Sequence, residues 1–197
     1  MSTVDLPRTL PYQPVRMSVQ RYHELTLAGA FTEHDCVELL DGVVTEKMSK
    51  NPPHRIVTRR CDLELSRIVP AGWHVQNQEP ITLQNSEPEP DVAVIRGQLS
   101  DYSNRHPQIG DIALVVEVAD TTLVTDRFKA QLYAQAGIPV YWLVNLPERL
   151  IEVMESPKST ASLPAYALST KYLAADLIPV VIAGQTVAHL TVGDLFV

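Results

Sequence analysis

The chain has 197 residues, of which 45% are hydrophobic, and carries a formal net charge of −7. This length suits one domain with a substantial core, and no apolar run approaches the roughly 18 residues needed to span a bilayer. The acidic balance counts against a dedicated nucleic-acid binder, which usually presents a basic face, and it fits a carboxylate-rich site that needs a cation.

The N-terminal segment is polar and rich in proline, so residues 1–17 are predicted to form an extended arm without a secretory signal. We therefore expect a cytoplasmic protein. Cys36 and Cys61 lack metal-finger spacing and are too few for a disulfide framework, which predicts two reduced thiols with Cys61 in the core.

The first half of the domain is predicted to hold two helices and a hairpin. Ser18 is a suitable N-cap for a helix that runs to about residue 28. Asp41-Gly42 separates two apolar runs over residues 37–45, which is a strong hairpin signal. Apolar residues at helical spacing predict a helix over residues 54–69, headed by His54.

The second half alternates strands with a helix. Strands are predicted at 73–78, 92–95, 112–118, 140–145 and 150–154, with a surface loop over 97–110 and residues 81–83 as an extension of the first strand's layer. Thr125 is the expected cap of a helix over 126–136, with Phe128 and Leu132 on one stripe and Lys129 and Tyr133 on another. This order predicts an α/β fold with a mixed sheet.

From residue 155 onward the chain changes to short β segments, at 166–168, 180–182 and 185–187, followed by a helical turn over 191–196. We predict a single domain over residues 18–197, with a core over about 18–154 and a β-rich C-terminal extension over 155–197.

Two acids lie in or next to apolar segments that are predicted to be strands. Asp91 precedes one strand, Glu117 lies near the end of the next, and Lys129 follows on the adjoining helix. Burying a carboxylate is costly unless something compensates it. Mg²⁺ prefers oxygen ligands, commonly one or two protein carboxylates, so Asp91 and Glu117 are candidate metal ligands. A lysine nearby can position or deprotonate the attacking water, or screen the charge of the transition state.

Each of these residues also suits an ordinary structural role. Asp91 is a common type of turn residue after proline, Glu117 suits an ion pair at a strand end, and Lys129 suits a solvated helix face. Glu38 is a further candidate acid or a polar hairpin residue. His54 is a candidate site residue, although a histidine at a helix start is more often structural.

Four more polar residues can be explained without a functional site. Tyr133 is better accounted for by packing than by chemistry. Arg55, Arg59 and Arg60 suit either phosphate contact or an ordinary solvated face of a helix.

Three segments together carry a family resemblance: Glu-Pro-Asp-Val-Ala-Val-Ile, Val-Val-Glu-Val-Ala-Asp, and Asp-x-x-Lys-x-x-x-Tyr-Ala-x-Ala-Gly-Ile-Pro-x-Tyr-Trp-Leu-Val-Asn. With Glu-Leu-Leu-Asp-Gly-Val-Val upstream, they resemble a bacterial family of restriction-endonuclease-like proteins, abundant in cyanobacteria, within the PD-(D/E)XK nuclease superfamily. The resemblance covers roughly residues 18–154 and, more weakly, the segment Asp194-Leu195-Phe196.

The resemblance implies a restriction-endonuclease-like core and a phosphodiesterase site that uses Mg²⁺ or Mn²⁺. Asp91 and Glu117 match the metal-binding acids, and the Val118 carbonyl is an implied further ligand. The superfamily lysine normally lies two residues after the second acid, where this chain has Ala119. Lys129 matches a lysine of the family's helix.

The resemblance also implies binding partners, and three hypotheses for the function stay open. It implies nucleic acid, with DNA favoured, as substrate, no membrane association, and a homodimer. The first hypothesis is a Mg²⁺-dependent endonuclease. The second is a binding protein on the nuclease fold with weak or no catalysis, which the alanine at position 119 favours. The third is a metal-dependent hydrolase of a substrate other than nucleic acid.

Overall fold

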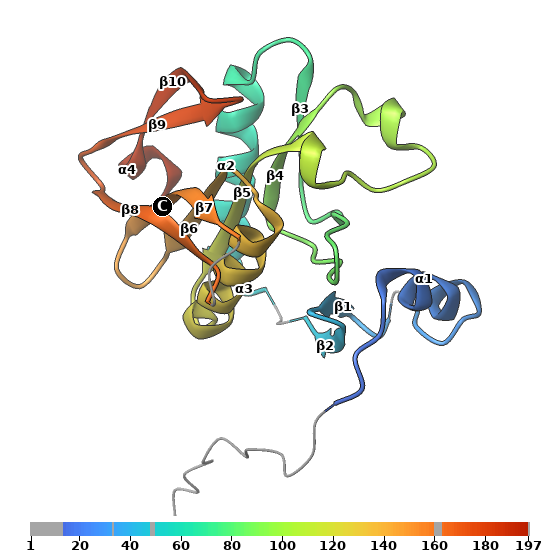
Figure 1. Cartoon of the computed structure of the whole chain (residues 1–197). Coiled ribbons are helices and arrows are strands. Elements are labelled where there is room, and N and C mark those ends of the chain that lie inside the picture. Colours follow the sequence, from blue (N-terminus) through green and yellow to red (C-terminus); the bar gives the residue numbers. More distant parts are fainter. Residues whose placement is uncertain (1–13, 33, 48–49, 160–162, 197) are drawn as a thin grey trace, which may run out of the picture.

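A six-stranded mixed sheet lies at the centre of the protein (Figure 1), in a computed structural model that describes residues 14–32, 34–47, 50–159 and 163–196. The spatial order is β3–β4–β5–β6–β7–β8, and β5 and β6 form the parallel pair. The strands are β3 (Trp73–Gln76), β4 (Val92–Arg96), β5 (Ile112–Ala119), β6 (Val140–Asn145), β7 (Leu150–Lys158) and β8 (Ala165–Leu173).

Helices cover both faces of this sheet. Helix α2 (Pro52–Ile68) packs Val57, Cys61 and Leu65 against one face, together with the hairpin β9–β10 (Leu177–Ile182 and Gln185–Thr191) and α4 (Val192–Leu195). Helix α3 (Leu123–Ala136) covers the other face. All eight residues of β5 are buried, as the continuous apolar run predicts for a central strand. The mixed α/β class predicted from the sequence is confirmed.

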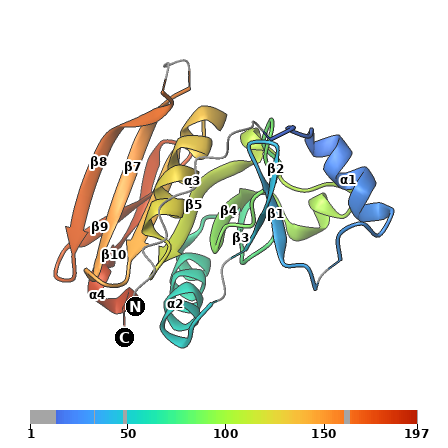
Figure 2. The ribbon, with the colours of Figure 1, turned by 90° about the horizontal axis from the view of Figure 1, so that it is seen from below.

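The N-terminal elements lie beside the sheet. Helix α1 (Val19–Leu27) and the hairpin β1 (Val37–Leu40)–β2 (Val43–Glu46) group on the side away from β7 and β8 (Figure 2). Asp41 and Gly42 form the predicted turn with φ of 47° and 76°. The hairpin docks on the chain between β3 and β4, since Gly42 N donates to Asn85 O and Glu87 N donates to Leu39 O.

Two local predictions are wrong, and the first concerns the start of α3. Helix α3 begins at Leu123, with Thr122 instead of Thr125 at the N-cap position, because the Thr122 hydroxyl bonds the Asp126 carboxylate and stabilises an earlier first turn. Of the two predicted stripes of α3, Lys129 and Tyr133 are both buried, whereas the other has Leu132 buried and Phe128 44% exposed.

The second wrong prediction concerns residues 81–83, which do not extend the layer of β3. Ile81 and Leu83 are instead buried in the core under α3, and the intervening Thr82 makes one isolated bridge to Gln108.

The other predicted helices and strands are present, but most of them begin or end at different residues. The loop over 97–110 contains two short 3-10 helices, at Leu99–Tyr102 and Ile109–Asp111, and the C-terminal strands are longer than their sequence signals. Of the predicted N-terminal arm, residues 1–13 lie outside the described residues. Among the residues that the structure describes, no helix has the length and apolar character needed to cross a membrane.

Candidate active site

Asp91 is held at the start of β4 by several donors. It is 6% exposed, and its Oδ2 accepts a hydrogen bond of 2.9 Å from the Val118 backbone N–H of the neighbouring strand. Nε2 of His54, from the first turn of α2, lies 3.0 Å from the same oxygen. Nε2 of Gln78 donates to Oδ1 at 3.3 Å. The carboxylate is therefore fixed by three different segments, unlike a solvated turn residue.

Glu117 lies beside Asp91 because β4 and β5 are adjacent antiparallel strands. Alternation along β5 places Glu117 on the α3 face, where it is 3% exposed. Its Oε2 accepts from the Asp91 backbone N–H at 3.4 Å, and its Oε1 accepts from the Tyr133 hydroxyl at 2.7 Å. The side chain of each predicted acid thus accepts a hydrogen bond from the backbone of the segment that carries the other acid.

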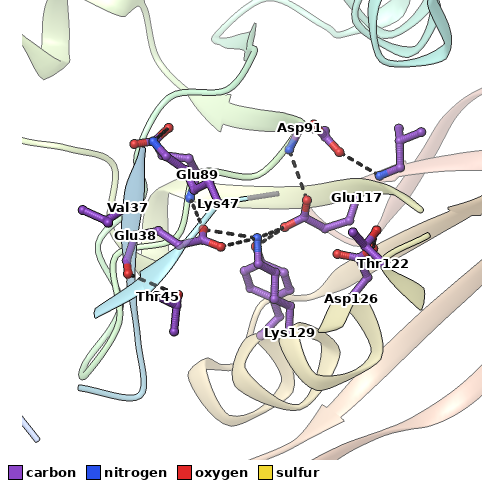
Figure 3. A network of polar contacts seen from close by, with 12 residues as sticks. Val37, Glu38, Thr45, Lys47, Glu89, Asp91, Glu117, Thr122, Asp126 and Lys129 are labelled. Carbon is purple, nitrogen blue, oxygen red and sulfur yellow. Dashed lines mark hydrogen bonds and ion pairs between the residues drawn. The ribbon is translucent and has the colours of Figure 1, made fainter. Parts of the chain in front are cut away.

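Lys129 joins these acids to the N-terminal hairpin (Figure 3). Its ammonium lies between two carboxylates, 2.9 Å from Glu38 Oε1 and 3.3 Å from Glu117 Oε1. Its side chain is 9% exposed, which excludes a solvated helix face. Glu38 in β1 is 5% exposed and also accepts from the Glu89 backbone N–H at 3.2 Å. Hairpin, sheet and helix α3 therefore meet at one ammonium group.

Ala119, at the position where the superfamily has its lysine, is fully buried in the core under α3. That position contributes packing, whereas the positive charge reaches Glu117 from the adjacent helix. The chain thus has alanine where the superfamily has lysine, and Lys129 contacts Glu117 from helix α3 instead.

Negative charge exceeds positive charge in this buried cluster. Burial raises the pKa of Glu117 to about 8; Lys129 opposes this shift, and the nearby acids add to it. Burial likewise raises the pKa of Asp126 to about 6. Burial alone favours the neutral amine of Lys129, but the carboxylates of Glu117 and Glu38 outweigh it and raise its pKa. This direction favours the protonated amine of Lys129 at neutral pH.

The cluster opens to a cavity of about 680 Å³ between the hairpin β1–β2, the start of α2 and helix α3. The lining includes Glu38, Asp91, Asp126, Lys129 and His54, and Glu117, which is not part of it, contacts Lys129. Three further basic residues line the same cavity, namely Arg16, Lys47 and Lys50. Lys47 also pairs with Glu89 at 2.7 Å. A ligand entering here meets both signs of charge, because Asp41, Glu46 and Glu89 also line the cavity and Arg16 pairs with Asp41.

The structure brings together all five predicted site side chains: Glu38, His54, Asp91, Glu117 and Lys129. It also adds two on α3 that the sequence analysis did not place in the site. Asp126 lies one turn before Lys129, a spacing that could have identified it, and bonds Thr122. Tyr133 is fully buried, as a packing role requires, but its hydroxyl also binds Glu117.

Two of the arginines on α2 have structural partners. Arg59 pairs with Asp62 one turn later, and Arg60 donates to the backbone carbonyls of Asp194 and Phe196. Arg60 thereby attaches the C-terminal segment to α2, which agrees with an ordinary structural role.

Comparisons with known proteins agree with this arrangement. A solved structure described as a putative nuclease belonging to DUF820 from Anabaena variabilis superposes with a TM-score of 0.65 at 16% identity, covering 93% of this chain and 98% of that one. This likeness establishes a shared fold. No curated protein sequence matches the chain significantly.

The family profile named Uma2 and described as "Putative restriction endonuclease" matches residues 19–186, which is most of the chain. The match includes every acid of the site, the lysine and the strands that carry them. It also agrees with the resemblance to the PD-(D/E)XK superfamily that the sequence motifs carry. The chain therefore belongs to the Uma2 family of restriction-endonuclease-like proteins.

Proposed function

We propose that this protein is a nuclease that requires Mg²⁺ or Mn²⁺ and hydrolyses phosphodiester bonds in DNA. One observation carries the proposal. The charged amine of Lys129 contacts the buried acids Glu38 and Glu117. Glu117 in turn accepts a hydrogen bond from the backbone of Asp91, which lines the cavity. The family description supports the same class of activity.

The site residues fit a hard divalent cation. Four carboxylates, each at most 6% exposed, share one lysine and one histidine: Glu38, Asp91, Glu117 and Asp126. Oxygen-rich and negatively charged surroundings are what Mg²⁺ and Mn²⁺ prefer. Asp91, Glu117 and the Val118 backbone would hold the ion. When bound, the ion supplies an activated water and stabilises charge on the phosphoryl oxygens.

The chain's own residues then have defined roles. Lys129, whose pKa is raised, supplies positive charge beside Glu38 and Glu117, which favours charge stabilisation over proton transfer from water. His54 lies on the cavity wall with Nε2 toward Asp91 and Nδ1 3.4 Å from the Thr58 hydroxyl, which fixes its ring. His54 therefore orients Asp91 at the edge of the cavity.

DNA as substrate is supported by the basic residues that line the cavity. Arg16, Lys47 and Lys50 surround the acids in a chain whose net charge is −7. Localised positive charge is what a polyanionic backbone requires, and phosphate contacts position a nucleic acid without reading its sequence.

Plasmid nicking by the full chain tests the proposal. Cleavage should require Mg²⁺ or Mn²⁺, stop with chelator, and fall by at least about a hundredfold in Asp91→Asn. Glu64→Gln is the matched control, because Glu64 pairs with Arg67 in the last third of α2 and lies outside the cavity lining. Absence of nicking by folded wild-type protein that binds the metal would favour a binding protein on this fold or another substrate.

A further inference from the structure

A second group of possible metal ligands lies outside the Asp91 cluster. His23 of α1, Glu87 of the chain between β3 and β4, and His106 of the chain between β4 and β5 each offer a ligand atom, and these atoms all lie within 4.8 Å of one another. His23 Nε2 is 2.6 Å from both carboxylate oxygens of Glu87. The rings of His23 and His106 meet edge to face at 6.1 Å.

Glu87 is held in place as a metal ligand usually is. It is 5% exposed, so its carboxylate is largely removed from water and needs compensation. The Thr82 hydroxyl donates to its Oε2 at 2.8 Å, and its backbone N–H donates to Leu39 O at 2.7 Å. A hydrogen bond from a neighbouring side chain is the common way in which a protein orients a ligating carboxylate.

The ligand types favour zinc over magnesium. Zn²⁺ binds imidazole nitrogen and carboxylate oxygen at about 2.0–2.2 Å, whereas Mg²⁺ takes oxygen ligands. Tetrahedral ligand atoms lie about 3.3 Å apart at those distances. The His23–Glu87 separation of 2.6 Å and the upper limit of 4.8 Å for the others lie on either side of that value. Two histidines and one acid also form the set that leaves a fourth position open.

A cavity of about 660 Å³ adjoins the three residues, which all line it, along with Tyr102 and Arg105. This cavity and the one at Asp91 share Glu89 in their walls, but the two sets of ligands share no residue. We propose that His23, Glu87 and His106 form a zinc site with its open coordination position toward this cavity. Bound zinc would join α1 to two segments of the core.

Cobalt is the probe of choice, because four-coordinate Co²⁺ with nitrogen ligands absorbs visible light strongly and six-coordinate Co²⁺ with oxygen ligands does so weakly. The full chain, stripped with chelator, is titrated with Co²⁺ in the Asp91→Asn background, which weakens the other metal site. The expected result is one equivalent of strongly absorbing Co²⁺ that Zn²⁺ displaces.

His23→Ala and His106→Ala should each weaken this binding by more than about a hundredfold, whereas His189→Ala, on exposed β10, should not. Zinc should also raise the melting temperature of the Asp91→Asn protein and not that of the two variants. Weak absorption only, or unchanged binding in both histidine variants, overturns the proposal. Mg²⁺-dependent nicking by wild-type protein is scored separately, so the two proposals can fail independently.

Discussion

Lys129 and Tyr133 both contact Glu117, but they act on it differently. The lysine compensates its charge, whereas the tyrosine donates a hydrogen bond from a fully buried ring. Burial, together with Glu117, keeps the pKa of Tyr133 well above its ordinary value, so the hydroxyl stays protonated. The direction of the Glu117 carboxylate therefore depends on the Tyr133 hydroxyl.

Tyr133→Phe should lower metal-dependent cleavage about tenfold and destabilise the fold by about 1–3 kcal/mol, because a buried oxygen of Glu117 loses its hydroxyl donor. Tyr141→Phe is the matched control: Tyr141 is equally buried and packs on Tyr133, but its hydroxyl donates to the backbone carbonyl of Asp126. Urea denaturation should show a loss of stability in both variants. Equal loss of activity in both would remove Tyr133 from the site.

Glu117 also predicts how stability depends on pH in metal-free protein. Its pKa of about 8 exceeds the usual 4.5, so the folded state binds more protons than the unfolded state between these values. Stability should therefore fall as pH rises through this window, by up to a few kcal/mol. The decline should be smaller in Glu117→Gln, and saturating Mg²⁺ should stabilise wild-type protein more at pH 8 than at pH 5.5. Parallel curves for the two proteins would contradict this assignment.

At the scale of elements, the hairpin β1–β2 delivers Glu38 to Lys129, and its turn depends on Gly42. Gly42 has φ of +76°, and a Cβ there would lie 2.8 Å from the Cβ of Arg16 and 3.0 Å from Met17 O. Gly184, in the turn of β9–β10, has φ of +77° with nothing within 4 Å of such a Cβ. The two glycines share a positive φ, and they differ in the contacts that an added Cβ would make.

Gly42→Ala should destabilise the protein by about 2 kcal/mol or more, and Gly184→Ala by about 1 kcal/mol, because the second substitution carries only the strain of positive φ. The free energies of unfolding of the two variants are measured by urea denaturation and fitted with the same m-value. Equal losses would mean that contact with the segment before α1 does not restrain the turn.

The elements differ in how far the sequence could predict them. Strands β4 to β6 were predictable because their apolar runs are long and their ends carry strong signals. The buried face of α3 was not, since it presents Asp126, Lys129 and Tyr133 to the acids while Phe128 is exposed. Apolar periodicity cannot identify a helix face that is buried against charge. His23, Glu87 and His106 lie far apart in the chain, so no spacing signals their approach.

At the scale of the whole molecule, an acidic chain places three basic side chains beyond Lys129 in the wall of one cavity, among carboxylates. If Arg16, Lys47 and Lys50 contact phosphates, the logarithm of DNA affinity should fall with the logarithm of salt concentration with a slope of about −3 for duplex DNA. Binding is measured in Ca²⁺ to prevent cleavage. Lys50→Gln should reduce the slope by about one, whereas Lys158→Gln, on β7 and outside the cavity, should leave it unchanged.

The most direct test of the proposed site compares plasmid cleavage by wild-type protein and Lys129→Met in saturating Mn²⁺, with the fold of both checked by circular dichroism. Cleavage should be slower by about 10²–10³ in the variant, since the charge that stabilises the site is lost while the carboxylates remain. Cleavage at the wild-type rate by folded Lys129→Met would contradict the claim that this lysine, reached from α3, completes the site.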